Sequence, residues 1–175
     1  MDNFVIGENV ELMAFLRTSH VGFRGIWVSG ARASGRSHLL RACSSAALQS
    51  GRQAIYLDCG GPESEWSAQV LRAAELFSAR NALMAIDNLG QLKGRQQHEE
   101  AVMSIYQTLH ALEGEMLVSH DQSALGVEFD LPDLNSRMRG FAHFSLVPLQ
   151  DHGKAEVLSR RARAKGYDLP DAVLE

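Results

Sequence analysis

The feature that most constrains the fold is an alternation of short β-rich apolar runs with stretches of helical periodicity. The runs are GIWVS, QAIYLDC, ALMAID, EMLVS and FAHFSLV, at residues 25–29, 53–59, 82–87, 115–119 and 141–147. Between and after them, apolar residues recur at helical spacing, which predicts helices from 35–37 to about 50–51, from 64 to 77, around 102–112 and from 151 to 165. Strands that alternate with helices pair in parallel and are covered on both faces. We therefore predict an α/β fold, a five-stranded parallel sheet flanked by helices.

The segment between the first predicted strand and the first predicted helix is a variant of the phosphate-binding loop. Its residues are Gly30, Ala31, Arg32, Ala33, Ser34, Gly35, Arg36, Ser37 and His38. They fit the pattern G-x-x-x-x-G-K-[ST], except that an arginine replaces the lysine. Backbone N–H groups of such a loop, together with the helix N-terminus, face an anion. An arginine keeps the charge and bridges phosphate oxygens, so we expect it to bind a diphosphate better than it grips a γ-phosphate for catalysis. The alternative is a glycine turn that merely joins strand to helix.

A second feature supports the nucleotide interpretation of this loop. The stretch ALMAIDN, residues 82–88, is an apolar strand that ends in Asp87. At the carboxyl edge of a parallel sheet, beside the loop, such an acid stands next to the Mg²⁺ of a bound nucleotide. Ser37 would supply a hydroxyl to the metal, and Asp87 a carboxylate, directly or through water. The sequence thus predicts a Mg²⁺ site formed by Ser37 and Asp87.

Three segments together resemble the AAA+ module of the bacterial replication initiator DnaA and its regulatory relatives. They are the loop followed by SHLLRAC, the strand with IDN, and LPDLNSRMRGFAHFSLVPLQDHGKAEVLSRRARAKGYDLPD, which is the most specific. The opening DNFVIGEN is similar to the segment that leads into the AAA+ core, so the resemblance runs from residue 2 to about 171. It implies an AAA+ P-loop NTPase base domain over residues 1–149, followed over 150–175 by the incomplete start of the helical lid. Arg36 and Asn88 are themselves similar to a regulatory branch that inactivates DnaA.

The resemblance also assigns roles to single residues. Asn88 stands where AAA+ ATPases carry a second acid that prepares the attacking water; an amide cannot accept that proton, so we expect weak hydrolysis by the chain itself. Ser119 and Asp121 correspond to the polar sensor near the γ-phosphate, although a strand-end serine and a turn-forming aspartate explain them equally well. Arg137, which we place in a polar loop, corresponds to the arginine finger presented to a neighbouring subunit. A solvated charge is its alternative, and Arg139 is the other candidate.

The function that the resemblance implies is regulatory. The chain would bind an adenine nucleotide, ADP or ATP and preferably ADP, with Mg²⁺, and would promote hydrolysis of DnaA-bound ATP through Arg137, restraining the initiation of DNA replication. Its partners would be DnaA and, in a full-length protein, the DNA sliding clamp, whose binding motif is not found here; we expect a truncated chain. Two alternatives stay open: a P-loop ATPase domain of an initiator or helicase loader, and a scaffold with a vestigial nucleotide site.

Composition limits the class of partner and the compartment. The 175 residues, 45% hydrophobic, suffice for one domain with a substantial core. A net charge of −4 gives no overall attraction to DNA, so we do not expect direct DNA binding. No apolar run approaches a membrane span, the start lacks a signal-peptide pattern, and Cys43 and Cys59 form no C-x-x-C pair. We expect a cytoplasmic protein without membrane contact.

Overall fold

The sheet predicted from the sequence is present in the computed structural model, which describes residues 7–78, 80–164 and 166–167. Within these residues the sheet has five strands in the order β2-β3-β4-β1-β5, and each neighbouring pair is parallel. The strands are β1 Arg24–Ser29, β2 Ala54–Asp58, β3 Leu83–Asp87, β4 Glu115–His120 and β5 Ala142–Ser145. The α/β prediction is confirmed, with small shifts at the strand ends.

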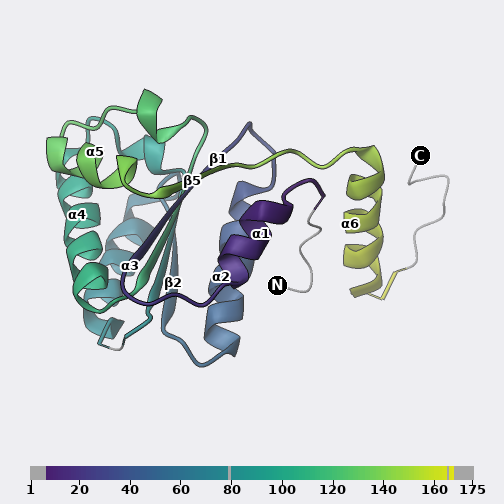
Figure 1. Cartoon of the computed structure of the whole chain (residues 1–175), viewed down its shortest axis with the longest axis horizontal. Coiled ribbons are helices and arrows are strands. Elements are labelled where there is room, and N and C mark those ends of the chain that lie inside the picture. The colour runs from purple at the N-terminus through teal and green to yellow at the C-terminus, as the bar shows by residue number, and fades with distance from the viewer. Residues whose placement is uncertain (1–6, 79, 165, 168–175) are drawn as a thin grey trace.

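Helices cover both faces of the sheet. On one face lie α1 Val10–Arg17 and α2 Arg36–Gln49; on the other lie α3 Glu63–Leu76, α4 Gln96–Ala111 and α5 Pro132–Arg139. Short 3₁₀ turns occupy Leu89–Leu92 and Ala124–Gly126. In Figure 1 an extended segment leads from β5 past α1 to α6, Asp151–Ala164. None of the helices within the described residues combines the length and apolar character that crossing a membrane requires.

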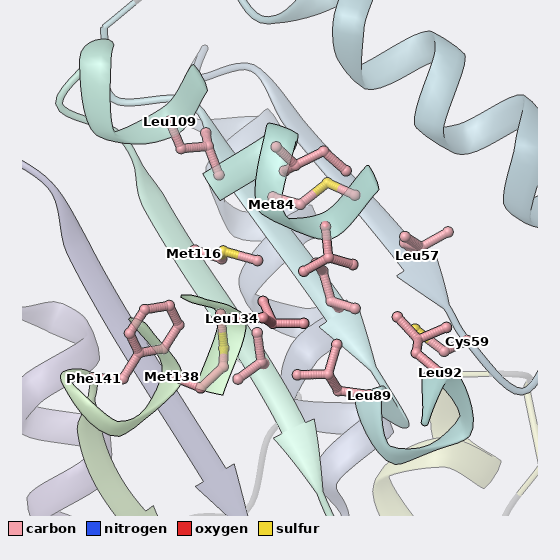
Figure 2. Packing of buried hydrophobic residues seen from close by; sticks show 14 of the residues in the cluster. Leu57, Cys59, Met84, Leu89, Leu92, Leu109, Met116, Leu134, Met138 and Phe141 are labelled. Atoms are coloured by element: carbon pink, nitrogen blue, oxygen red, sulfur yellow. The ribbon is translucent and has the colours of Figure 1, made fainter. Parts of the chain in front are cut away.

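The two layers of core follow from the alternation of side chains along each strand. In β1, Ile26 and Val28 pack toward α1 and α2, whereas Trp27 packs toward α4 and α5. Figure 2 shows this second layer, where Met84 and Met116 of the central strands lie among leucines and Phe141. Both tryptophans, Trp27 and Trp66, are buried in it. Because the strands are parallel, their carboxyl ends lie at one edge of the sheet, and the candidate site is at this edge.

Two short helices differ from the expectations. Residues 132–139 form α5, so Arg137 lies on a helix and the prediction of a polar loop is wrong. Leu134 and Met138, one turn apart, bury themselves against the core and impose the helical conformation. Helix α1 was not expected; its Leu12 and Met13 are buried in the same way. A helix of eight residues is marginal in isolation, and tertiary packing stabilises it.

The segment before α1 is tied to the segment after β5. The side chain of Asn9 donates to the carbonyl of Val147 at 3.0 Å, and the Val147 N–H donates to the Asn9 Oδ1 at 2.8 Å. This paired contact ties the start of α1 to the segment that follows β5. Much of the opening DNFVIGEN, and the end of the predicted lid after residue 167, lie outside the described residues.

Candidate phosphate-binding cleft

The loop from Gly30 to Gly35 joins β1 to α2 and curls over the helix N-terminus. Ser34 donates its N–H to the carbonyl of Ala31 at 3.2 Å, which closes a turn. Ala33 and Gly35 have φ values of +64° and +100°, in the left-handed region. A Cβ at Gly30 would lie 2.8 Å from Ser34 Oγ and 3.0 Å from the Leu146 carbonyl, so only glycine fits there without displacement. Alternating right- and left-handed residues point their N–H groups to one side, which is the geometry of an anion nest.

An open cleft of about 700 Å³ lies beside this loop, within the usual size range of small-ligand sites. It is lined by Arg32, Arg36, Gly60, Asn88, Gly90, Gln91, Lys93, His120, Asp121, Gln122, Gly126, Val127 and Glu128. Three of these residues carry a permanent positive charge and two are carboxylates. The lining therefore favours a polar, negatively charged ligand.

Arg36, the first residue of α2, marks where that ligand would sit. Its Nη1 atom is buried and has no hydrogen-bond partner among the described residues. A buried guanidinium N–H without an acceptor is costly, so such an atom indicates a site that an anion completes. The first N–H groups of a helix such as α2 lack intrahelical acceptors, and a helix N-terminus favours an anion. The buried Ser34 hydroxyl is also unpartnered within the described part of the chain.

Asp87, the predicted metal ligand, is fully buried at 0% exposure. Its Oδ2 accepts from the Tyr56 hydroxyl at 2.7 Å, and its Oδ1 accepts from the Asn88 N–H at 3.1 Å and from the Ser119 hydroxyl. Ser37 is exposed at the start of α2, and no hydrogen bond within the described residues joins it to Asp87. The Mg²⁺ predicted at Ser37 and Asp87 does not fit this arrangement, because protein donors already surround the carboxylate. No group of three or more His, Cys, Asp or Glu residues within the described ranges is arranged to hold a metal.

Asn88 lies at the edge of the cleft and is held by an acid from the neighbouring strand. Its backbone is left-handed, with φ +56°, and its side-chain amide donates to Asp58 Oδ1 at 2.8 Å. The same Oδ1 accepts from the Gly60 N–H at 2.9 Å. The amide nitrogen is thus engaged with Asp58. The side-chain amide of Asn88 cannot act as a base in the cleft. The carboxylate that contacts it is Asp58, at the end of β2.

His120 lines the cleft between the two residues predicted as the sensor. Its ring stacks on Trp27 with centroids 5.3 Å apart, and its Nδ1 accepts from the Gln122 N–H at 2.8 Å. The same nitrogen lies 2.9 Å from Asp121 Oδ1, an ion pair only when the ring is protonated. Burial lowers the pKa of His120, the opposing pull of Asp121 being weaker. At neutral pH the ring is therefore uncharged, with Nδ1 acting as acceptor.

The structure separates the predicted sensor pair. Ser119 is buried and turned to Asp87, where its hydroxyl donates to the carboxylate and accepts from the Asn88 N–H at 3.0 Å. Asp121 is exposed and lines the cleft. Only Asp121 of the two is therefore placed to meet a ligand in the cleft.

Among solved structures, this arrangement of elements is found in the replication initiator DnaA. The AMPPCP-bound DnaA of Aquifex aeolicus has a TM-score of 0.72 at 18% identity, covering 99% of this chain and 57% of that one. Domain III of the Thermotoga maritima DnaA has the same TM-score at 15% identity, covering 99% and 77%. The chain has the fold of a DnaA AAA+ domain. A Neisseria meningitidis protein, solved in solution, is 27% identical with a TM-score of 0.53, covering 85% and 90%. No family model matches the chain.

This DnaA-type domain corresponds to little more than half of the Aquifex aeolicus protein. Within it, Arg137 lies on α5, outside the cleft, and is exposed. Its guanidinium carbon lies 5.6 Å from the centre of the Tyr106 ring on α4, a cation–π contact that orients the side chain. Arg139, in the same last turn, lines a separate shallow groove beside Asn135.

Several residues at the candidate site were missed in the sequence, among them Tyr56, Asp58 and His120 and the cleft-lining Lys93. Asp58 ends an apolar strand, as Asp87 does, so the same signal applied to QAIYLDC would have found it. The Tyr56 hydroxyl carries no local signal, because its partner Asp87 lies on β3, and the stacking of the His120 ring on Trp27 likewise joins two strands.

Proposed function

We propose that the chain binds an adenine nucleotide in the cleft, with a preference for ADP. The observation that carries this proposal is the buried Nη1 of Arg36 at the N-terminus of α2, which has no hydrogen-bond partner in the part of the chain that the structure describes. The AMPPCP named with the structurally similar DnaA of Aquifex aeolicus supports the choice of an adenine nucleotide. The phosphate-neutralising cation in this proposal is Arg36. A planar guanidinium bridges two phosphate oxygens but is bulkier than the usual lysine, which favours a diphosphate over a reacting triphosphate.

We further propose that the chain acts on DnaA, in the manner of the DnaA inactivator Hda, by promoting hydrolysis of DnaA-bound ATP. Two features support a role on a partner. The amide of Asn88 provides no base for an attacking water, and its nitrogen is engaged by Asp58. Arg137 is exposed on α5 and is not among the residues that line the chain's own cleft. In this proposal residues 1–149 form the base domain and 150–175 begin a helical lid, and a complete protein would also meet the sliding clamp in the cytoplasm.

Arg137 is the residue that would act on the partner's nucleotide. An arginine supplied in trans stabilises the charge that develops on the γ-phosphate and is worth about 10³–10⁵ in rate in other nucleotidases. The contact with Tyr106 reduces the freedom of the side chain before the partner binds, and less entropy is then lost on docking. Restraining replication initiation follows from converting DnaA-ATP to DnaA-ADP.

Phosphate release from DnaA-ATP, with the clamp loaded on DNA and the complete protein added, tests this proposal. Arg137→Ala should abolish the stimulation while leaving the circular-dichroism spectrum and ADP affinity unchanged. Arg139→Ala is the matched control, because it removes the same exposed charge from the same helical turn. Normal stimulation by Arg137→Ala would show that the finger assignment is wrong.

A second candidate function is an ATPase of the chain itself, as in an initiator or helicase loader. It is favoured by one observation, the carboxylate of Asp58 behind the cleft. Turnover of ATP by the pure chain, abolished by Asp58→Asn or Asp87→Ala, would establish it. The remaining alternative is a scaffold with a vestigial nucleotide site. Calorimetry with ADP and with ATP tests it, since such a scaffold binds neither nucleotide.

A further inference from the structure

We infer that nucleotide binding in this cleft does not depend on a divalent cation at Asp87, and that Tyr56 is the residue that keeps the metal away. This inference rests on the proposed nucleotide binding and deepens it. It reverses the Mg²⁺ site expected from Ser37 and Asp87.

The first argument is the set of partners that surround the carboxylate. Asp87 accepts three hydrogen bonds, from the Tyr56 hydroxyl, the Ser119 hydroxyl and the Asn88 N–H, and has 0% exposure. Mg²⁺ needs ligand oxygens at about 2.0–2.1 Å in an octahedron and usually keeps several waters. A fully buried carboxylate that accepts three hydrogen bonds keeps one free lone pair, on Oδ2 beside Tyr56, and its 0% exposure leaves no room for the octahedron.

The second argument concerns how firmly Tyr56 is held. Its ring lies under the guanidinium of Arg41, with 4.1 Å from the guanidinium carbon to the ring centre, and packs against the core beneath α2. Its hydroxyl donates to Asp87 Oδ2 at 2.7 Å, so the held ring keeps that donor directed at the carboxylate. A metal ion bound to Asp87 Oδ2 would break the hydrogen bond from Tyr56 and leave its half-buried hydroxyl without an acceptor. The free-energy cost of that lost hydrogen bond opposes metal binding.

The third argument is that the cleft supplies the missing positive charge itself. Arg32, Arg36 and Lys93 line it, and the buried Nη1 of Arg36 has no partner among the residues described. These side chains can neutralise a diphosphate without a metal, whereas the carboxylates of Asp121 and Glu128 only partly offset them.

The test measures ADP binding to the full chain by calorimetry in millimolar Mg²⁺ and in EDTA. Between Mg²⁺ and EDTA, the wild-type dissociation constant for ADP should change by less than about threefold. The variant Tyr56→Phe frees Asp87 Oδ2 but keeps the ring under Arg41. It should bind ADP at least about tenfold more tightly in Mg²⁺ than in EDTA. Tyr106→Phe is the matched control, because it removes a tyrosine hydroxyl on α4 and should behave as the wild type. A wild-type affinity that falls more than about tenfold in EDTA overturns the inference.

Mn²⁺ binding to the nucleotide-free protein, followed by electron paramagnetic resonance, gives a second readout. The wild type should bind no Mn²⁺ at micromolar concentration, Tyr56→Phe should bind it, and Tyr56→Phe/Asp87→Asn should lose it again. Wild-type binding that Asp87→Asn removes overturns the inference, as does the absence of any gain in a folded Tyr56→Phe. If ADP binds under neither condition, the proposed nucleotide binding fails, and the Mn²⁺ result still decides whether Asp87 is closed to metal.

Discussion

The side-chain amide of Asn88 donates to the carboxylate of Asp58 at 2.8 Å, across the ends of β3 and β2. The two residues are 30 positions apart in the sequence, and the group that faces the Asp58 carboxylate is an amide and not a second carboxylate. The identity of residue 88 therefore depends on what stands at residue 58, because two carboxylates at this distance would repel each other.

The first prediction is that Asn88→Asp destabilises the protein instead of repairing a hydrolytic site. At pH 7 the free energy of unfolding should fall by about 1–3 kcal/mol, because a hydrogen bond is replaced by like charges. Repulsion raises the carboxyl pKa values of the new pair above their unfolded values, so the loss should shrink as pH falls toward about 4. Urea unfolding at the two pH values measures it.

The double variant Asp58→Asn/Asn88→Asp is the control for this pair. It restores one amide and one carboxylate with their positions exchanged, so most of the lost stability should return. If the two single changes simply add in the double variant, the contact between residues 58 and 88 carries no coupling energy and the interpretation is wrong.

The second prediction concerns Arg36. Arg36→Ala should weaken ADP binding by about 10- to 100-fold, as expected for a charge-assisted hydrogen bond. The free energy of unfolding should stay within about 0.5 kcal/mol or rise, because the variant removes a buried N–H that has no partner in the described structure. The ADP affinity of Arg36→Lys should lie between those of the wild type and Arg36→Ala, since lysine keeps the charge and loses the planar guanidinium. Calorimetry and urea unfolding measure the two effects.

Arg32→Ala is the comparison for that experiment, because Arg32 lines the same cleft but is exposed. It should weaken ADP binding by less than about threefold. Equal losses from the two variants would mean that general positive charge, and not the buried guanidinium, recognises the phosphates.

The third prediction is a pH dependence from His120. Burial holds its pKa in the folded protein below the unfolded value of 6.5, so below pH 6.5 the unfolded state binds more protons than the folded state. Stability contributed by the neutral ring is fully present above pH 6.5 and should be lost as pH falls toward the lowered pKa. His120→Asn keeps an acceptor for the Gln122 N–H and cannot titrate, so its stability should fall less steeply between pH 7 and pH 5. Parallel slopes for wild type and variant in urea titrations would contradict this assignment.

The fourth prediction compares a buried with an exposed ion pair. Glu115, at the start of β4, is buried and bridges Arg24 at 2.7 Å and Arg52 at 3.0 Å. Glu115→Gln should cost about 3 kcal/mol, because it leaves the Arg24 guanidinium, whose side chain is only 10% exposed, without its counter-charge. Glu113→Gln breaks the exposed pair with Arg80, 3.1 Å apart, and should cost less than about 1 kcal/mol. Thermal and urea unfolding of both variants test the ranking; similar losses would show that the Glu115 cluster gains nothing from burial.

What the sequence by itself determined is the part of the protein whose signals lie within a few consecutive residues. The alternation of short apolar runs with helical stretches predicted the parallel α/β fold. Strand β1, the turn at Gly30 and Gly35, and the cation at Arg36 are neighbours along the chain, so their spacing predicted an anion site at the start of α2. The buried apolar strand before Asp87 likewise predicted its place at the carboxyl edge of the sheet.

Only the tertiary structure decided which groups the site residues contact. Tyr56 and Ser119 lie 31 and 32 positions from Asp87, and they meet it because β2 and β4 are the neighbours of β3 in the sheet. Strand order and register are set by packing over the whole core, which no local pattern records. For the same reason α5, a polar eight-residue segment in the sequence, becomes a helix through the burial of Leu134 and Met138 and takes Arg137 to its surface. Local periodicity specified the helices and strands. Long-range packing specified which groups surround the Asp87 carboxylate, and therefore whether it is open to a metal ion.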